Sequence, residues 1–376
     1  MRCRHFGRTF VFHAHQTGAY QMICRDLVQC VLRRDLDVVI YGFGDEGRRF
    51  LDVCKGHGIN VAAILDDKAA STGGQAISFN DYAARPDAEK PVFVLCSHSP
   101  DKMRKALTDR FATIQWLPLS AFQVYEPTVF TPHIFYEGLI SDLVTNATEI
   151  SALRTILEDA KSRDVLDGIS LYRTTFEYEA LRRIYSQHYD DDCRNLLKLN
   201  SEETYVDGGT FDGDTIDSFL DAVEHGYAAI HAFEPSAEQS RYLERKYSSA
   251  PRIFIHQNAI SDVDENVSFS DHASRSAMIQ GEPTNTVVQA VALDACDISN
   301  ISFIKLNIEG SELDALAGSR NLIRACKPKL AIHSYHRPSH LWQVPKAIKE
   351  IWPGYRLYLR HHDLSLMETV CYAIPG

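Results

Sequence analysis

The stretch TYVDGGTFDGDTIDSF, residues 204–219, decides the fold. A short apolar run ends at Asp207, and the turn that follows it contains Gly208, Gly209 and Gly213. Glycine lets the backbone take a positive φ and approach a ligand closely, and a helix that begins after the turn offers free N–H groups. A strand, a glycine turn and a helix in this order predict an α/β domain with a ligand at the end of its first strand.

The next apolar run, AAIHAF, ends in Glu234, which follows Asp207 by 27 residues. A carboxylate at the tip of the second strand is placed to bind the two ribose hydroxyls of a nucleoside. The first loop also carries Asp207, Asp212 and Asp214, which would repel a pyrophosphate and attract a sulfonium or ammonium group. These charges favour S-adenosylmethionine over NAD.

Two further strand ends extend the same pattern. RIFIHQ leads into a segment that ends in Asp262, which we expect to border an adenine ring near its amino group. ISFIKL ends in Asn307-Ile308-Glu309-Gly310. Because ligands of open α/β sheets collect at the carboxyl ends of the strands, the tip of this fourth strand should border the site of group transfer.

Residues from about 203 to 372 resemble the FkbM family of S-adenosylmethionine-dependent methyltransferases. The resemblance rests on VDGGTFDGDT, AFEPSAEQSRYL, NAISD, the VALD turn, FIKLNIEGSELDALAGSRNLI and KPKLAIHSYHRPSHLWQVP, in the family's order and spacing. It implies a class I methyltransferase sheet of seven strands, six parallel and one antiparallel. It also implies methylation of a hydroxyl on a sugar, polyketide or glycan.

The resemblance carries over residue by residue. It implies that Asp207, Gly209 and Gly213 shape the methionine side of the pocket, that Glu234 holds the ribose and that Asp262 borders the adenine. The cofactor-binding residues predicted in this way are Asp207, Gly208, Gly209, Gly213, Glu234, Asp262 and Asn307.

Asn307 departs from the family pattern, because the family usually reads I-D-x-E-G where this chain reads LNIEG. Asparagine keeps the size and an acceptor oxygen of aspartate but lacks its charge, so it cannot act as a base or as a strong metal ligand. Slower, altered or absent transfer is the expected consequence.

Histidines in HSYH supply the candidate base. His333 and His336 are three residues apart, so on a strand their side chains point to opposite faces, which argues against a metal site. His336 lies at the carboxyl end of the strand and is the predicted general base, with Asn307 as the second catalytic candidate. Lys305 is interpreted as a structural ion-pair partner, and Glu309 as a ligand-binding residue, a partner of Lys305 or a helix cap.

A second glycine loop, VVIYGFGDEGRRF at residues 38–50, contains Gly42, Gly44 and Gly47 in the spacing of a dinucleotide fingerprint. Asp66 follows at about the place of the carboxylate that binds ribose hydroxyls. Three interpretations stay open: an NAD(H) site, a site for a nucleotide or nucleotide-sugar, or a packing or dimerisation domain. The acidic residues that follow Gly44 weaken the first, and we favour substrate handling or a structural role.

The alternation of strands and helices predicts two Rossmann-like α/β domains. The predicted parts are an N-terminal extension (1–36), a small Rossmann-like domain (37–122), a helical connector (123–202) and a methyltransferase domain (203–376).

Composition excludes several classes of protein. A net charge of -11 disfavours nucleic acid as a partner, and nine scattered cysteines without a C-x-x-C pair are typical of reduced thiols in the cytoplasm. No apolar run is long enough for a signal peptide or a membrane span. The oligomeric state stays open, homo-oligomers included.

These observations predict a cytoplasmic S-adenosylmethionine-dependent O-methyltransferase whose acceptor is a hydroxyl of a carbohydrate or related natural product. Two alternatives stay open. The first is an NAD(P)-dependent oxidoreductase that uses the N-terminal glycine loop. The second is a catalytically inactive, methyltransferase-like binding protein, which Asn307 keeps in consideration.

Overall fold

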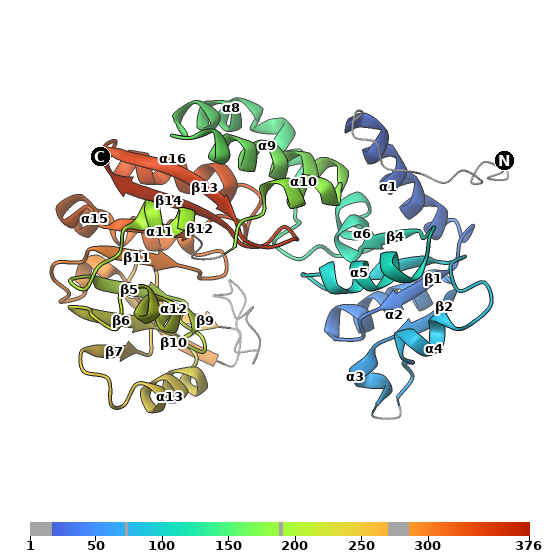
Figure 1. Cartoon of the computed structure of the whole chain (residues 1–376), viewed down its shortest axis with the longest axis horizontal. Helices are drawn as coiled ribbons and strands as arrows, with labels where there is room; N and C mark the ends of the chain where they lie inside the picture. The colour runs from blue at the N-terminus through green and yellow to red at the C-terminus, as the bar shows by residue number, and fades with distance from the viewer. Residues whose placement is uncertain (1–16, 72–73, 188–190, 270–285) are drawn as a thin grey trace. The chain divides into compact units, whose positions relative to one another are not determined.

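The computed structural model of the chain describes residues 17–71, 74–187, 191–269 and 286–376. The chain divides into two compact units, which Figure 1 shows coloured along the sequence. Unit 1 comprises Met1–Ser141, Gly168–Arg183 and Leu364–Met367, and unit 2 comprises Asp142–Asp167, Ile184–Asp363 and Glu368–Gly376. The first sixteen residues of the predicted extension lie outside the described residues.

Unit 1 is built on a four-stranded parallel sheet in the order β2-β1-β3-β4. Its two central strands, β1 and β3, are buried along their whole length, as expected when helices cover both faces of a parallel sheet. The strands are β1 (Val38–Tyr41), β2 (Val61–Leu65), β3 (Val92–Leu95) and β4 (Trp116–Pro118). The helices are α1 (Thr17–Leu32), α2 (Asp45–His57), α3 (Asp67–Ala70), α4 (Phe79–Ala83), α5 (Asp101–Arg110) and α6 (Leu119–Tyr125).

Aromatic side chains pack both faces of this sheet. On one face Tyr41 stacks on Phe79, with ring centroids 5.5 Å apart. The rings of Phe50, Phe122 and Phe130 form a second cluster, with Phe50 lying 5.2 Å from Phe122 and 5.3 Å from Phe130. Such pairs add to the free energy that burial of the rings supplies.

Helix α1 lies within the segment, residues 1–36, for which the sequence predicts an N-terminal extension without assigned structure. Leu27, Val28 and Val31 are buried at helical spacing, and the thiol of Cys24 donates a hydrogen bond to the carbonyl oxygen of Thr175 at 3.4 Å. The second half of α1 is therefore part of the core of unit 1, a role that its composition does not indicate.

Five helices lie between the two sheets in the sequence, where the sequence predicts helical structure. They are α7 (Leu139–Thr145), α8 (Ala147–Ile156), α9 (Ala160–Thr175), α10 (Tyr178–Ile184) and α11 (Asp191–Leu197). The boundary between the two units falls within this segment, so the helices are divided between them.

Unit 2 contains a seven-stranded sheet in the order β13-β14-β12-β11-β5-β6-β7. Its strands are β5 (Thr204–Gly208), β6 (Ala229–Phe233), β7 (Ile253–His256), β11 (Phe303–Leu306), β12 (Lys329–His333), β13 (Tyr355–His361) and β14 (Thr369–Pro375). The helices that follow β5 are α12 (Asp214–Ala222), α13 (Ala237–Lys246), the 3-10 turn η1 (Leu293–Ala295), α14 (Glu312–Ala317), α15 (Arg320–Cys326) and α16 (His340–Ile351). A small sheet in the order β8-β10-β9 consists of β8 (Ala259–Ile260), β9 (Glu265–Phe269) and β10 (Thr286–Val291).

Strand β14 differs in direction from its neighbours. It pairs antiparallel with β12 and with β13, whereas β5, β6, β7, β11 and β12 pair in parallel. The start of β14 therefore lies at the edge where the parallel strands end. The predicted α/β class with parallel-rich sheets is confirmed.

Packing of unit 2 centres on three aromatic rings. The ring centroid of Tyr205 on β5 lies 4.8 Å from that of Phe303 on β11 and 4.7 Å from that of Phe219 on α12. All three side chains are fully buried. The rings therefore join the starts of two adjacent strands to the helix that covers them.

A buried arginine attaches α9 to the sheet of unit 2. Arg360 on β13 is 1% exposed and its Nη2 lies 2.7 Å from Oδ2 of Asp159, just before α9. Its Nη1 donates to Ser162 Oγ at 3.0 Å. A buried guanidinium needs such a partner, because an uncompensated charge in the interior is costly.

We expect Asp159→Asn to lower the free energy of unfolding by about 2–3 kcal/mol, because it leaves Arg360 buried without its counter-charge. Asp167→Asn is the matched control, since Asp167 pairs with Arg154 at 3.0 Å on the surface, where a pair contributes about 0.5 kcal/mol. Urea denaturation measures both. Equal losses in the two variants would contradict this account of Arg360.

Candidate functional site

The ends of β5 and β11 mark the switch point of the seven-stranded sheet. From β5 the chain passes to β6 and β7 on one side, and it later returns to β11 on the other side of β5. Ligands of open α/β sheets bind outside the carboxyl ends of the strands at such a point. The residues that follow β5, β6 and β11 therefore define the candidate site.

Glycine is required at two positions of the loop after β5. Gly209 has a φ of 75°, and a Cβ there would lie 1.9 Å from the backbone oxygen of Asn307. Gly213 has a φ of 81°, and a Cβ there would lie 2.4 Å from the hydroxyl of Tyr247. A side chain at either position would combine backbone strain with a clash. At Gly208 the obstacle is the side chain of Leu306, which would lie 2.7 Å from an added Cβ.

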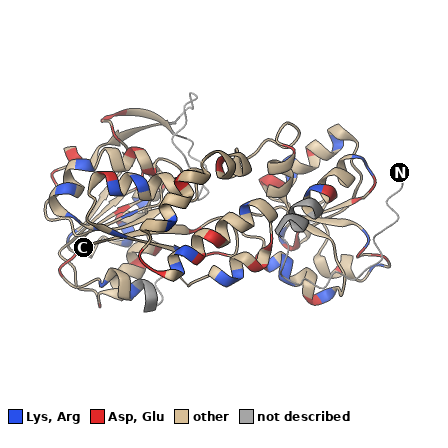
Figure 2. Ribbon diagram, turned by 90° about the horizontal axis from the view of Figure 1, so that it is seen from above, with Lys and Arg blue, Asp and Glu red and all other residues tan. Residues whose placement is uncertain are grey.

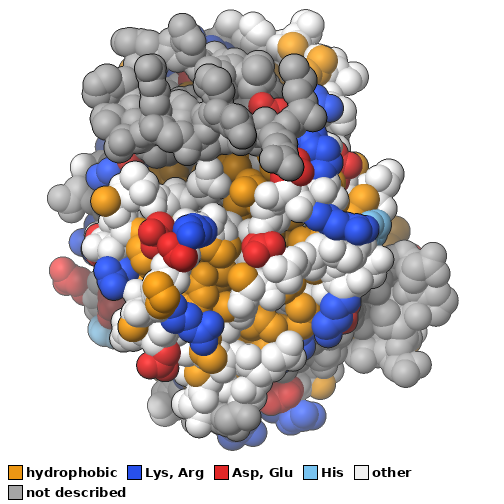
Figure 3. All heavy atoms as spheres, turned by 90° about the vertical axis from the view of Figure 1, so that its right-hand side faces the viewer, with side chains coloured by type: hydrophobic (Ala, Val, Ile, Leu, Met, Phe, Trp, Pro, Cys, Tyr) orange, Lys and Arg blue, Asp and Glu red, His pale blue; other side chains and the backbone are white. Residues whose placement is uncertain are grey.

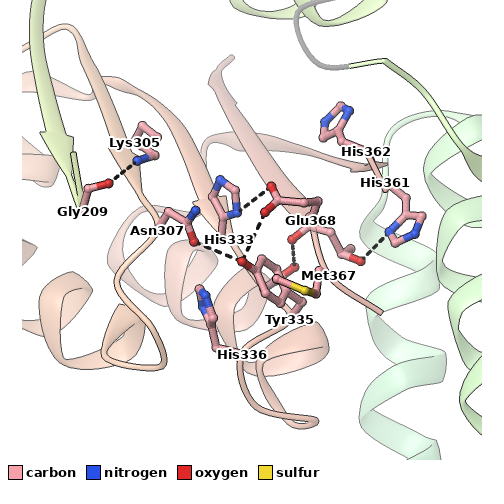
Figure 4. Close-up of polar contacts among 12 residues, drawn as sticks. Gly209, Lys305, Asn307, His333, Tyr335, His336, His361, His362, Met367 and Glu368 are labelled. Carbon is pink, nitrogen blue, oxygen red and sulfur yellow. Dashed lines mark hydrogen bonds and ion pairs between the residues drawn. The ribbon is translucent and has the colours of Figure 1, made fainter. Parts of the chain in front are cut away.

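Asp207 is fully buried and its carboxylate has two partners. Lys305 on β11 lies 2.9 Å from its Oδ1, and the Thr215 hydroxyl donates to its Oδ2 at 2.6 Å. The Lys305 ammonium also donates to the carbonyl oxygens of Gly208 and Gly209, as Figure 4 shows for Gly209. Asp207 therefore holds the loop in shape, and Lys305 offsets the charge that the sequence suggested would attract a cation.

Glu234 lies directly after β6 and is 6% exposed. Its carboxylate accepts the backbone N–H of Phe211 in the glycine loop at 2.9 Å and that of Ser236 at 2.9 Å. Burial raises the pKa of Glu234, and the two N–H groups oppose that rise. Glu234, the residue predicted to bind the ribose, is thus held against the loop after β5, at the carboxyl edge of the sheet where the prediction requires it.

Asp262 is exposed, so it lies at the rim and not inside the site. Its neighbour Ser261 contacts the region after α14 closely, because a Cβ on Gly318 would lie 2.0 Å from the Ser261 backbone oxygen. Its adenine-side role stays a prediction.

Asn307 belongs to a chain of polar groups at the ends of three strands. The Tyr335 hydroxyl lies 3.4 Å from Asn307 Oδ1 and 3.3 Å from Glu368 Oε1. Glu368 Oε2 lies 3.5 Å from Nδ1 of His333, the last residue of β12 (Figure 4). Glu368 precedes β14, and the antiparallel direction of that strand brings this carboxylate to the edge where β11 and β12 end.

His336 lies beside Tyr335, with ring centroids 4.1 Å apart, and belongs to a buried ion-pair cluster. Its Nδ1 is 2.7 Å from Oε1 of Glu312, and its Nε2 is 3.7 Å from Oε1 of Glu309. Glu312 Oε2 also faces Nδ1 of His340 at 3.1 Å, and its Oε1 accepts the Ile308 N–H at 3.0 Å. The cluster therefore links the turn after β11 to the start of α14 and to α16.

The two carboxylates determine the protonation of His336. Burial lowers the pKa of this imidazole, but the charges of Glu312 and Glu309 outweigh burial and raise the pKa to about 10. Burial acts in the opposite sense on Glu312, and the facing His336 and His340 hold its pKa well below the usual value. A ring that carries its proton at neutral pH cannot accept another, so this environment favours a structural role for the predicted base.

Glu312 and Glu368 are the site residues that sequence reasoning missed. Glu312 stands in the first turn of a helix, where acidic residues are common on solvated surfaces, so nothing in the sequence marks it as buried. Glu368 lies at the carboxyl edge because β14 runs antiparallel to its neighbours, and the sequence analysis does not say which strand is the antiparallel one.

The three glycines of the N-terminal loop belong to unit 1. Gly42 follows β1 with a φ of 98°, Gly44 is the N-cap residue of α2, and Gly47 lies buried in the first turn of that helix. They form the turn between strand and helix that their spacing predicts.

Charges of both signs are mixed along the helices of each unit (Figure 2). On the face drawn in Figure 3, acidic and basic side chains lie interspersed around a hydrophobic area. Within the described ranges, no group of three or more His, Cys, Asp or Glu residues is arranged to hold a metal ion. No helix among the described residues is long and apolar enough to cross a membrane.

Comparisons with known proteins bear on unit 2. Residues 207–363 match the family model described as the methyltransferase FkbM domain. The match begins at Asp207 and includes Glu234, Asn307 and the cluster around His336. Among curated proteins, none matches the sequence of this chain.

The fold is similar to that of a methyltransferase FkbM from Methylobacillus flagellatus KT, whose crystal structure gives a TM-score of 0.74 at 21% identity. The alignment covers 95% of this chain and 99% of the other, so the likeness in fold extends over both units. Aeropyrum pernix fibrillarin with bound S-adenosyl-L-methionine gives a TM-score of 0.32 at 12% identity, over 48% of this chain and 71% of that chain. An rRNA methylase from Streptococcus thermophilus also gives 0.32 at 12% identity, over 54% and 95%. The TM-scores of the fibrillarin and the rRNA methylase are too low for either structure to support a conclusion about this chain.

The His336 cluster predicts a pH dependence of stability. Because the pKa of His336 is raised from 6.5 to about 10 on folding, its contribution is complete below pH 6.5 and is lost as the pH rises through 10. We expect the free energy of unfolding to fall over this interval more steeply in the natural protein than in a His336→Gln/Glu312→Gln variant. Urea denaturation at a series of pH values measures the difference, with His57→Gln, at an exposed position, as the control. Equal slopes in the natural protein and the double variant would refute the assignment.

Proposed function

We propose that this chain, whose residues 207–363 match the methyltransferase FkbM domain, transfers a methyl group from S-adenosylmethionine to a hydroxyl of a sugar, glycan or related natural product. The observation that carries the proposal is the position of Glu234. This carboxylate lies at the tip of β6 and accepts a hydrogen bond from the glycine loop. It stands at the switch point of the sheet in unit 2, the unit that matches the methyltransferase family model.

The residues at this edge fit the chemical groups of S-adenosylmethionine. Glu234 offers carboxylate oxygens, which are suited to the two ribose hydroxyls. Glycines at positions 208 and 209 let the loop pack directly against β11, because a Cβ at either position would clash with Leu306 or with the backbone oxygen of Asn307. Asp207 acts through the loop, since Lys305 and Thr215 occupy its oxygens.

S-adenosylmethionine would supply a methyl group that is already activated as part of a sulfonium. The protein then has to position the acceptor oxygen, exclude water and remove the hydroxyl proton. Conspicuous catalytic motifs are not required for these tasks, which agrees with their absence from the sequence.

The polar chain from Asn307 to His333 is suited to the removal of that proton. His333 Nδ1 faces the Glu368 carboxylate, which would stabilise a positive charge on the ring if the ring accepted a proton. Tyr335 stays neutral, because burial and the charge of Glu368 raise its pKa well above the usual value. Its hydroxyl therefore links Asn307 to Glu368 without carrying charge.

Asn307 suits this arrangement better than aspartate would. An aspartate there would place a second carboxylate on the same Tyr335 hydroxyl that Glu368 contacts, and two like charges so close disfavour each other. In this proposal Glu368 supplies the negative charge that the family usually carries on the fourth strand.

Binding of S-adenosylhomocysteine to the purified chain tests the proposal. We expect Glu234→Gln to weaken binding at least tenfold, because the amide replaces one carboxylate acceptor by a donor and removes the charge. Glu238→Gln is the matched control, since Glu238 is exposed four residues further on and should bind as the natural protein does. Isothermal calorimetry measures all three affinities. An absence of binding to the natural chain, or equal affinities in all three proteins, would refute the proposal.

Transfer of labelled methyl from S-adenosylmethionine to sugars, oligosaccharides and polyketide alcohols tests the reaction itself. We expect Glu368→Gln to lower the rate at least tenfold while the affinity for S-adenosylhomocysteine changes less than twofold. If cofactor binds but no acceptor is methylated until Asn307 is replaced by aspartate, the inactive binding protein is the correct alternative.

A further inference from the structure

Unit 1 has its own switch point, which the proposed methyl transfer does not use. From β1 the chain passes to β2 on one side, and β3 lies on the other side of β1. The loop Gly42–Gly47 leaves β1 at this point, and the segment Cys96–Ser97–His98 leaves β3 beside it. The strand order therefore selects this edge as a ligand site independently of the glycine spacing.

The three glycines have three different surroundings. A Cβ on Gly42 would lie 2.8 Å from the Cys96 backbone oxygen, and a Cβ on Gly47 would lie 2.1 Å from the Gly42 backbone oxygen. These two glycines are needed for packing of the loop against β3 and of α2 against the loop. Gly44 is different, because a Cβ there would meet nothing within 4 Å. The protein's own packing does not explain a glycine at this position, whereas close approach of a phosphate to the backbone would.

Asp66, at the end of β2, completes the arrangement. Its Oδ2 accepts the Phe43 N–H at 2.8 Å and its Oδ1 accepts the Ala69 N–H at 2.9 Å. Glu234 in unit 2 holds the N–H groups of Phe211 and Ser236 in the same way. In each unit, therefore, the carboxylate that follows the second strand accepts the N–H of a phenylalanine in the loop after the first strand.

The local charges permit an anionic ligand. Asp45 and Glu46, which the sequence suggested would repel a pyrophosphate, face Arg48 and Arg49 at 3.8 and 3.5 Å. Burial would raise the pKa of Asp66, but the N–H groups of Ala69 and Phe43 and the charge of Arg48 lower it, so the carboxylate is ionised at neutral pH. An ionised carboxylate is the acceptor that ribose hydroxyls require.

Aromatic polar groups stand on the other side of the switch point. His98, three residues after β3, has its Nδ1 3.2 Å from the Tyr136 hydroxyl, and its ring centroid lies 5.2 Å from that of His133. These rings pack against one another next to the segment that leaves β3.

The size of the sheet limits the ligand. A dinucleotide fold consists of two mononucleotide-binding halves with six strands in all, and the described sheet of unit 1 has four, so it lacks a complete second half. We infer that unit 1 binds a nucleoside diphosphate, free or joined to a further group, with the ribose hydroxyls on Asp66 and the phosphates over Gly42–Gly44. This site does not depend on methyl transfer in unit 2.

Calorimetric titration of the full chain with ADP, UDP, GDP and CDP tests the inference. We expect at least one of them to bind, and Gly44→Ala to weaken that binding at least tenfold, because the added methyl group occupies the space in front of the loop. Gly56→Ala is the matched control: Gly56 also has nothing within 4 Å and lies near the far end of α2, the helix that Gly44 caps, so its variant should bind normally. Asp66→Asn should weaken the nucleotide more than it weakens inorganic pyrophosphate.

Three results would overturn the inference: no binding of any of the four nucleotides at millimolar concentration, equal binding by the Gly44→Ala and Gly56→Ala variants, or pyrophosphate binding as tightly as the nucleotides. NADH that binds far more tightly than ADP would replace it with a dinucleotide site. S-adenosylhomocysteine titrated into the same variants should bind unchanged, which separates this test from that of the methyltransferase site. The melting temperature of each variant shows that a lost signal is not lost folding.

Discussion

The buried pair between Asp207 and Lys305 is the interaction on which the site of unit 2 depends. The two residues face each other on adjacent strands, and the Lys305 ammonium also holds the carbonyl oxygens of Gly208 and Gly209. Removal of either partner of a buried pair costs about 3–5 kcal/mol, because the other charge is left in the interior. The pair therefore fixes the path of the glycine loop over β11. With the loop fixed, the N–H of Phe211 lies where Glu234 can accept it, and the carboxylate that we propose as the ribose-binding group is held at the end of β6.

Two adjoining charge clusters lie at the end of β11, and the rings of Tyr335 and His336, with centroids 4.1 Å apart, connect them. Glu312 with His336 and His340 is fully buried and connects three elements, so its charges contribute rigidity. Asn307, Tyr335, Glu368 and His333 lie at the ends of neighbouring strands and contain the histidine that we assign to proton removal (Figure 4). The carboxylates that face each ring account for the difference. Glu312 and Glu309 together keep His336 protonated, whereas Glu368 faces Nδ1 of His333 from a longer distance than Glu312 faces His336.

Much of this arrangement could be predicted from sequence, and the exceptions have physical reasons. The strand ends at Asp207 and Glu234 were predictable, because apolar runs and glycines mark where strands stop. Lys305 was predicted as an ion-pair partner and the structure confirms that, but its pairing with Asp207 was not predictable, because ion pairs between strands depend on sheet order and register. His336 was predicted as a base from its place after a strand, but a pKa depends on facing charges, and Glu312 was indistinguishable from a solvated helix residue. Helix α1 was missed because a basic start outweighed the apolar spacing of Leu27, Val28 and Val31 in the interpretation of the N-terminus.

The loops after the first strands of the two units share one layout. In each unit a glycine at the end of the first strand packs against a backbone oxygen across the switch point, and a carboxylate after the second strand holds the loop. The central claim is that Glu234 is the ribose-binding group of the unit that matches the methyltransferase family. A crystal structure of the chain with S-adenosylhomocysteine tests it most directly. The account predicts both ribose hydroxyls within hydrogen-bond distance of the Glu234 carboxylate, and a ribose bound away from the end of β6 would contradict it.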